Sequence, residues 1–187
     1  RVFSATENAI AGSRGQHNSC GIRRRVYLGC YLFKMGNSMQ LVTLDFETFY
    51  DKQYSLSKLT TEEYINDYRF EAIGVATKIN ENETTWCSGD HSEIQNYLDA
   101  IDWDDSIMVA HNAMFDAAIL SWRFGIKPKR IADTLSMSRA IDGVNAKHSL
   151  AAAASRHGLG QKGNEVIAAL GKQRKDFDTE ELERYGG

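Results

Sequence analysis

Proline and cysteine are both rare in this chain. Pro128 is the one proline among 187 residues, and the three cysteines, Cys20, Cys30 and Cys87, are far apart in the sequence. No CxxC pair and no Cys/His ligand spacing is present, which excludes the common zinc motifs. An odd number of separated cysteines is also unlike the disulfide frameworks of small secreted proteins. The cysteines therefore indicate reduced thiols, and so an intracellular, cytoplasmic protein.

A long hydrophobic run is lacking as well. No stretch approaches the roughly 20 apolar residues that span a bilayer, so the sequence predicts no membrane partner. Hydrophobic residues make up 42% of the chain and charged residues 25%, which is typical of a globular protein and argues against a disordered or fibrous one. The length of 187 residues corresponds to one domain, since a domain takes roughly 150 residues.

Charge is unevenly distributed, although the formal net charge is only −3. The first 38 residues carry six bases against one acid, residues 39–120 carry four bases against 16 acids, and residues 121–187 carry twelve bases against eight acids. The acidic middle region is unfavourable for a polyanionic partner unless cations are bound there. The basic residues of the last region are typical of a solvated helix surface, with contacts to phosphates as the alternative.

The first 38 residues lack steady periodicity and are rich in Gly, Ser, Asn and Arg. Met39 directly precedes the first strongly patterned element, so we expect the folded domain to cover residues 39–187. Residues 1–38 are expected to be disordered or not part of the natural protein. A transit peptide is the alternative, because such segments are rich in Arg and Ser and poor in acids.

Strand and helix patterns alternate from Met39 onward. β-rich runs predict strands at residues 40–46, 70–79, 83–87, 106–110 and 130–132. Helical spacing predicts helices at residues 92–101, 112–124, 134–140, 149–156, 164–170 and 179–185. Asp133 is a candidate N-cap. The order predicts an α/β fold with a mixed five-stranded sheet, in which an antiparallel meander is followed by parallel strands and flanked by helices.

Asp45 and Glu47 flank Phe46 at the end of the first expected strand. Because side chains alternate along a strand, both carboxylates lie on one face while Phe46 points into the core. Two carboxylates this close repel each other, and a divalent cation is the usual way to neutralise them. The alternative is a pair of solvated acids at a strand end.

A second polar group is the segment HNAMFD, residues 111–116, which directly follows the strand at 106–110. The segment opens a helix, and the carboxyl ends of strands form the ligand-binding edge of open α/β sheets. We therefore expect Asp116 to face the same edge as Asp45 and Glu47. Taken singly, Asn112 is also explained as a helix N-cap and Asp116 as a first-turn partner of the helix dipole.

Together these motifs resemble the DEDD superfamily of 3'-5' exonucleases, whose fold is ribonuclease H-like. The D-x-E-T of residues 45–48 is followed by Asp116, 71 residues after Asp45, in the setting N-A-M-F-D. Within the superfamily, residues 39–187 are most similar to the proofreading domain of family A DNA polymerases, particularly those of bacteriophages. The segment HSLAAAASRHGLGQKG, residues 148–163, is similar to the stretch before the last motif of these domains.

The resemblance implies a metal-dependent 3'-5' exonuclease that hydrolyses phosphodiesters from the 3' end of single-stranded DNA. The implied catalytic acids, which would also be the ligands of two divalent ions (Mg²⁺ or Mn²⁺), are Asp45, Glu47 and Asp116. The implied contacts to the substrate's 3' end are Thr48, Asn112 and Phe115. The domain would be the proofreading part of a polymerase whose polymerase domain is C-terminal to it, in the host cytoplasm if the protein is viral.

The third motif departs from the family pattern. In the tyrosine subgroup it is Y-x-x-x-D, and from Tyr185 the acid would fall two residues past Gly187. The histidine form, H-x-x-x-x-D, is met only by His111 and Asp116, which already fit the second motif. We therefore expect a C-terminally incomplete domain with weak or no activity. Two alternatives stay open: an RNA-trimming exonuclease of the same superfamily, and a non-catalytic nucleic-acid-binding fragment of the same fold.

Overall fold

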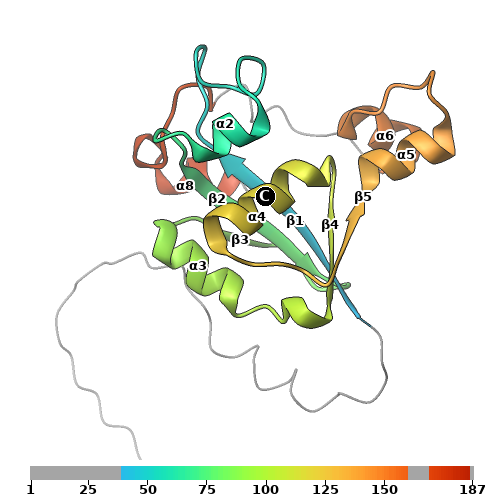
Figure 1. The fold of residues 1–187 in the computed structure, drawn as a ribbon, viewed down its shortest axis with the longest axis horizontal. Coiled ribbons are helices and arrows are strands. Elements are labelled where there is room, and N and C mark those ends of the chain that lie inside the picture. The colour runs from blue at the N-terminus through green and yellow to red at the C-terminus, as the bar shows by residue number, and fades with distance from the viewer. Residues whose placement is uncertain (1–38, 160–168, 186–187) are drawn as a thin grey trace, which may run out of the picture.

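The computed structural model describes residues 39–159 and 169–185, and Figure 1 shows its arrangement of strands and helices. The expected disordered or non-native segment, residues 1–38, lies outside the described residues. The five strands are β1 (Gln40–Thr48), β2 (Ala72–Ile79), β3 (Thr85–Cys87), β4 (Ser106–Ala110) and β5 (Arg130–Asp133). The helices are α2 (Thr61–Asn66), α3 (His91–Asp99), α4 (Ala113–Phe124), α5 (Thr134–Asp142), α6 (Leu150–Arg156) and α8 (Thr179–Tyr185).

The strands form one mixed sheet in the order β3-β2-β1-β4-β5. β1 pairs antiparallel with β2, and β2 pairs antiparallel with β3. β4 is parallel to β1 and β5 is parallel to β4, with helix α4 as the connection between β4 and β5. This confirms the expected α/β architecture, a meander followed by parallel strands.

The main core lies on one face of the sheet, under α2, α3 and α4. Alternate residues of β1, Val42, Leu44 and Phe46, are buried and pack with buried residues of all three helices. Ile94 and Leu98 of α3 are examples, spaced four apart on one helix face. The view in Figure 1 is from this side, with α4 in front of the strands.

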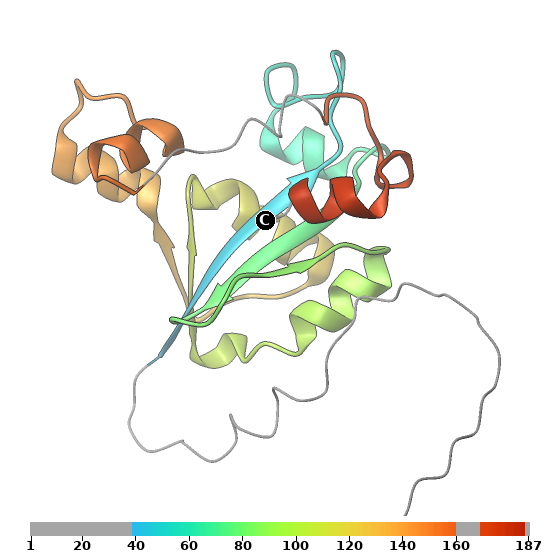
Figure 2. The ribbon, with the colours of Figure 1, turned by 180° about the vertical axis from the view of Figure 1, so that it is seen from behind.

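Helix α8 packs on the opposite face of the sheet. Its Leu182 contacts a small cluster formed by Ile73 of β2 and Ala169, both buried, with Phe177 alongside. Figure 2, the view from behind, shows α8 crossing in front of the strands. The sheet therefore has helices on both sides.

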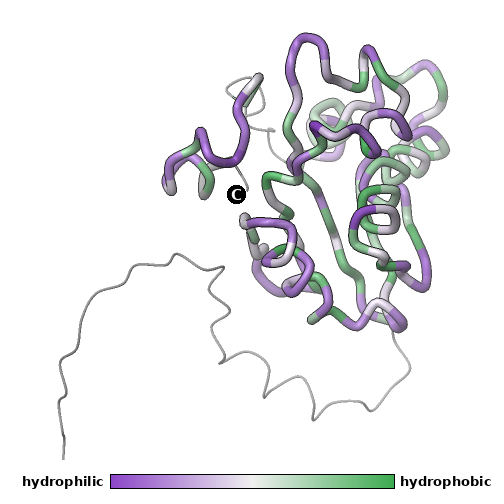
Figure 3. Tube along the Cα trace, turned by 60° about the vertical axis from the view of Figure 1, so that its left-hand side comes forward, coloured by the Kyte–Doolittle hydropathy of each residue, from purple (hydrophilic) through white to green (hydrophobic). Residues whose placement is uncertain are grey.

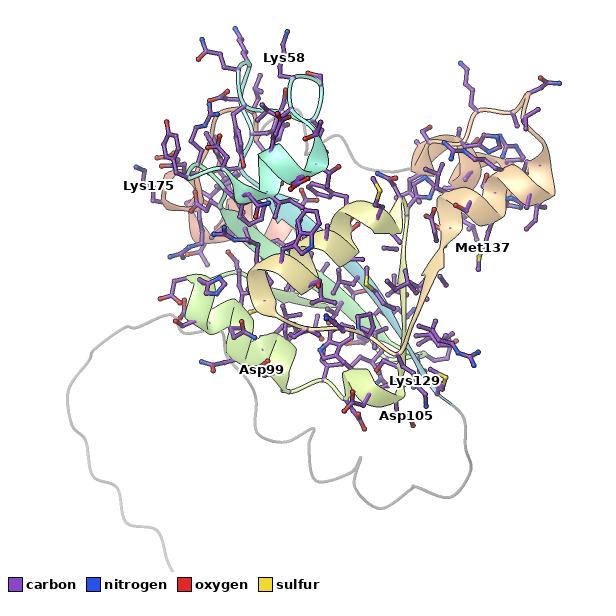
Figure 4. The ribbon with its side chains drawn as sticks, viewed as in Figure 1. Lys58, Asp99, Asp105, Lys129, Met137 and Lys175 are labelled. Carbon is purple, nitrogen blue, oxygen red and sulfur yellow. The ribbon has the colours of Figure 1, made fainter. Side chains whose placement is uncertain are left out.

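The edge strand β5 is anchored at its start and carries two helices at its end. Lys129 forms an ion pair with Asp105 at 3.4 Å, and the Lys129 N–H donates to the Trp103 carbonyl at 3.0 Å (Figure 4). Beyond β5, helices α5 and α6 project from the sheet, and Met137 of α5 is 50% exposed. An ion pair between Arg156 and Asp142 joins these two helices.

Hydrophobic residues gather along the strands and the inner helix faces, whereas the outer turns are mostly hydrophilic (Figure 3). Such a distribution is that of a globular domain with its apolar side chains buried on both faces of the sheet. Within the ranges 39–159 and 169–185, no helix is both long enough and apolar enough to cross a membrane.

The structure differs from the expected elements in a few places. The six-residue helix α2 was not expected, and β1 continues two residues further, to Thr48. Helix α5 runs on to Asp142, and Asp133 is its N-cap, as expected. The expected helix at 164–170 falls mostly outside the described residues. Short elements such as α2 escape periodicity arguments because one or two turns show too little pattern.

Candidate active site

A cleft opens where β1 and β4 separate. The parallel pairing of β1 with β4 ends at Thr43 and Val109, whereas β1 continues to pair with β2 as far as Thr48. In Figures 1 and 2 the two strands diverge toward their carboxyl ends. The carboxyl ends of parallel strands are the usual ligand edge of an open sheet.

The end of β1 carries the two carboxylates on the face opposite the core. Phe46 is buried, at 4% exposure, and its ring stacks on that of Phe124 with centroids 5.6 Å apart. Asp45 is exposed and Glu47 is half-buried. The alternation expected for these three residues is therefore present.

Asp116, in the first turn of α4, reaches the separated part of β1. Its Oδ1 atom accepts a hydrogen bond from the Phe46 backbone N–H at 3.0 Å, and the residue is 4% exposed. Burial raises the pKa of Asp116 to about 7; the Phe46 N–H opposes this, and the negative charges of Asp45 and Glu47 add to it. The three acids therefore act on one another electrostatically.

All six residues singled out in the sequence line one cleft of about 430 Å³. They are Asp45, Glu47, Thr48, Asn112, Phe115 and Asp116. The remaining lining residues are Phe46, Tyr50, Ser55, Leu56, Tyr64 and His111. Segments far apart in the chain thus meet here, from β1, the loop after it, α2 and the start of α4.

Thr48 is held by Tyr64 of α2. The Tyr64 hydroxyl donates to the Phe49 carbonyl at 2.5 Å, so the Thr48 hydroxyl is the donor in the 2.9 Å bond between the two side chains. Burial raises the pKa of Tyr64 to about 12, which keeps its hydroxyl protonated at neutral pH. Thr48 therefore has a fixed orientation at the cleft wall.

Asn112 and Phe115 lie at the start of α4. Asn112 occupies the N-cap position in the left-handed region, with φ of 66°, but its side chain makes no cap hydrogen bond. Asn112 is therefore at the expected N-cap position, but its side chain does not cap the helix. Phe115 is half-buried, and its ring lies 5.9 Å from that of Tyr64.

Comparison with known proteins bears directly on this cleft. A family model described as 3'-5' exonuclease matches residues 31–182. The chain belongs to the 3'-5' exonuclease family. Among curated proteins, this exonuclease chain is similar to DNA polymerase subunit gamma-1 of Xenopus laevis, at 32% identity over 84 residues. That match covers 44% of the chain and only 7% of the polymerase.

Solved structures share the exonuclease fold at low sequence identity. NrnC of Brucella melitensis, in a structure with bound Mg²⁺, has a TM-score of 0.55 at 16% identity, covering 78% of this chain and 64% of NrnC. The catalytic core of RRP6 from Trypanosoma brucei has a TM-score of 0.53 at 18% identity, covering 80% and 36%. These likenesses confirm the expected ribonuclease H-like fold.

The donor chemistry of the exonuclease cleft suits a hard divalent cation. Among the described residues, no group of three or more His, Cys, Asp or Glu side chains is arranged to hold a metal ion as the side chains stand. Asp45, Glu47 and Asp116 nevertheless share the cleft, and burial of Asp116 beside two acids is a cost that a cation would relieve. Carboxylate oxygens are the ligands that Mg²⁺ and Mn²⁺ prefer.

Sequence reasoning missed Tyr50, Ser55, Leu56 and Tyr64 as lining residues, and it gave His111 no role of its own within the segment 111–116. Tyr64 had a detectable signal, since the capping-box pattern T-x-x-E at Thr60 to Glu63 directly precedes it. The loop residues Ser55 and Leu56 had none, because only the fold brings that loop to the cleft.

Proposed function

We propose that this domain removes nucleotides one at a time from the 3' end of single-stranded DNA, as the proofreading part of a DNA polymerase. The observation that carries the proposal is the convergence of Asp45, Glu47 and Asp116 on one cleft at the carboxyl edge of the sheet. The similarity to a polymerase gamma subunit supports DNA as the substrate and a polymerase domain as the partner.

Asp45, Glu47 and Asp116 would hold two divalent ions, Mg²⁺ or Mn²⁺. When bound, these ions supply the charge that activates a water and stabilises the leaving 3' oxygen. With a pKa of about 7, Asp116 is only partly ionised at neutral pH. Cation binding would therefore favour its ionised form and release a proton.

Asn112, Phe115 and Thr48 would position the 3' end. The exposed Asn112 amide both donates and accepts hydrogen bonds, and the Phe115 ring offers a surface on which a base stacks. The water oxygen bonds to phosphorus as the bond from phosphorus to the 3' oxygen breaks. The attacking water loses a proton and the departing 3' oxygen gains one, so a nucleoside 5'-monophosphate leaves and the shortened strand ends in a 3' hydroxyl.

The test is shortening of a 5'-labelled single-stranded DNA in Mg²⁺, with EDTA as the blank. The assay uses this chain and a version extended past Gly187 to supply a third-motif acid. We expect a ladder of products one nucleotide apart, and Asp45→Ala or Asp116→Ala should lower the rate by orders of magnitude with little loss of fold. Asp104→Ala, an exposed acid elsewhere, is the matched control.

Two outcomes would contradict the proposal. Parent-like digestion by either cleft variant would show that the acids are not the catalytic ones. Binding of the DNA without any metal-dependent shortening, by the chain and by its extended version, would favour a non-catalytic module. An oligoribonucleotide of the same sequence tests the RNA-trimming alternative, which predicts faster removal of ribonucleotides.

A further inference from the structure

The start of α4 lacks a cap of its own. Asn112 holds the N-cap position with positive φ, and its side chain makes no cap hydrogen bond. The first N–H groups of a helix need acceptors, and a non-glycine residue in the left-handed region persists only when its surroundings hold it there. Some other group must therefore fix this turn.

Asp133, at the end of β5, supplies the acceptor. Its Oδ1 atom accepts from the backbone N–H of Asn112 at 2.9 Å and of Ala113 at 3.1 Å. The parallel register pairs Ala110 with Asp133, so the ends of β4 and β5 lie side by side. Figure 1 shows α4 and α5 starting at this same end of the sheet.

The same carboxylate also caps α5. Oδ1 accepts from the Leu135 N–H at 3.1 Å, and Oδ2 accepts from the Ser136 N–H at 3.3 Å and hydroxyl at 2.6 Å. Burial acts to raise the pKa of Asp133, but the hydrogen bonds from both helices outweigh it and keep the pKa below its ordinary value. One ionised side chain therefore joins two helix starts.

His111 forms a second link between the same two turns. Its Nδ1 atom lies 3.0 Å from the Thr134 hydroxyl oxygen, and its Nε2 atom donates to the His148 carbonyl at 3.0 Å. The Thr134 hydroxyl donates a hydrogen bond to the Ala110 carbonyl at 3.2 Å. The turn that precedes α4 is thus joined to the start of α5 by two contacts, the Asp133 carboxylate and the His111–Thr134 pair.

We propose that Asp133 is a positioning residue of the exonuclease site, which fixes Asn112 at the cleft and the Asp116 carboxylate against the Phe46 N–H. Asn112 and Asp116 are four residues apart, so a shift of the α4 start moves both. A misplacement of about 1 Å at a reacting group lowers a rate by about 100-fold. The inference rests on the proposed function only for the roles of Asn112 and Asp116 in the nuclease reaction.

The test compares Asp133→Ala with Asp90→Ala. Asp90 caps α3 alone, through the Glu93 N–H at 2.9 Å, and it does not line the cleft. We expect both variants to lower Tm, and Asp133→Ala to lower it more, because the Asp133 carboxylate caps two helices and Asp90 caps one. Only Asp133→Ala should speed hydrogen exchange of the Phe46 amide, by about tenfold or more, and lower kcat by about 10- to 100-fold with KM less affected.

Asp133→Asn is a graded variant, because its amide keeps a single acceptor oxygen for two helix starts. Its Phe46 exchange rate and kcat are expected to fall between those of the parent and Asp133→Ala. If both Asp133 variants had the same Phe46 exchange rate and the same kcat as Asp90→Ala, the proposal would be overturned. The Phe46 exchange rate tests the positioning role even if the parent shows no nuclease activity. Failure of the positioning role is therefore distinguishable from failure of the proposed nuclease function.

Discussion

Asp116 combines deep burial with two negative neighbours, and this combination makes its own contribution to stability depend on pH in the metal-free protein. Its pKa is about 7 in the folded state against an ordinary value of 3.8 in the unfolded chain. Between these values the unfolded state loses the proton first, so the contribution of Asp116 to the free energy of unfolding falls as pH rises. At about 1.4 kcal/mol per pH unit, Asp116 destabilises the fold by up to about 4 kcal/mol at pH 8.

Asp116→Asn should therefore stabilise the protein at pH 8 in EDTA, by about 2–4 kcal/mol relative to the parent, and change little at pH 4. The amide oxygen still accepts from the Phe46 N–H, while the charge is gone. Urea unfolding at pH 4, 6 and 8 measures the difference, with Asp104→Asn as the exposed control. Parallel stability curves for parent and Asp116→Asn would contradict the raised pKa.

At the scale of the element, strand β1 separates a core face from a cleft face. Phe46→Asp should abolish the cooperative melt, because an unpaired charge in the core costs several kcal/mol. Thr43→Asp is the matched control on the other face, where Thr43 is exposed and opposite Lys78 in the register. We expect it to shift stability by less than about 0.5 kcal/mol. The same thermal unfolding curve for both variants would refute the orientation of β1, in which Phe46 faces the core and Thr43 faces away from it.

Helix α2 depends on its cap. The Thr60 hydroxyl accepts from the Glu63 N–H at 3.2 Å, and Glu63 accepts in return from the Thr60 N–H at 2.9 Å. Thr60→Ala should lower the free energy of unfolding by about 1 kcal/mol, whereas Thr61→Ala, one position on, removes no cap. Chemical denaturation of both variants checks this, and equal losses would count against the capping box.

The contrast between β1, which was predicted, and α2, which was not, shows which features can be predicted from the sequence. Alternation at Asp45, Phe46 and Glu47 is local, so the strand, its core face and its acidic face could be predicted. That Asp133 caps α5 is also local and was expected, but its bonds to α4 depend on the pairing of β4 with β5. Contacts between chain segments with no shared periodicity, such as Thr48 with Tyr64, are set by the fold alone.

At the scale of the whole molecule, the domain boundary expected at Met39 remains a prediction. β1 begins at Gln40, and trypsin has sites at Arg23, Arg24, Arg25 and Lys34. Limited trypsin digestion is expected to remove the residues before the boundary and leave a core that starts near Met39, because its backbone is held in the sheet. Mass spectrometry identifies the product. Survival of an intact segment from Arg1 to Asn37 would place the boundary earlier.

The early separation of β1 from β4 divides the cleft between two parts of the molecule. Asp45 and Glu47 belong to the β1–β2 ladder, whereas Asp116 belongs to α4 and, through Asp133, to β5. β1 pairs with β4 through residues 40–43 of β1. A cation held by acids from both parts would join them across the gap. The width of the cleft and the occupancy of the metal site would therefore change together.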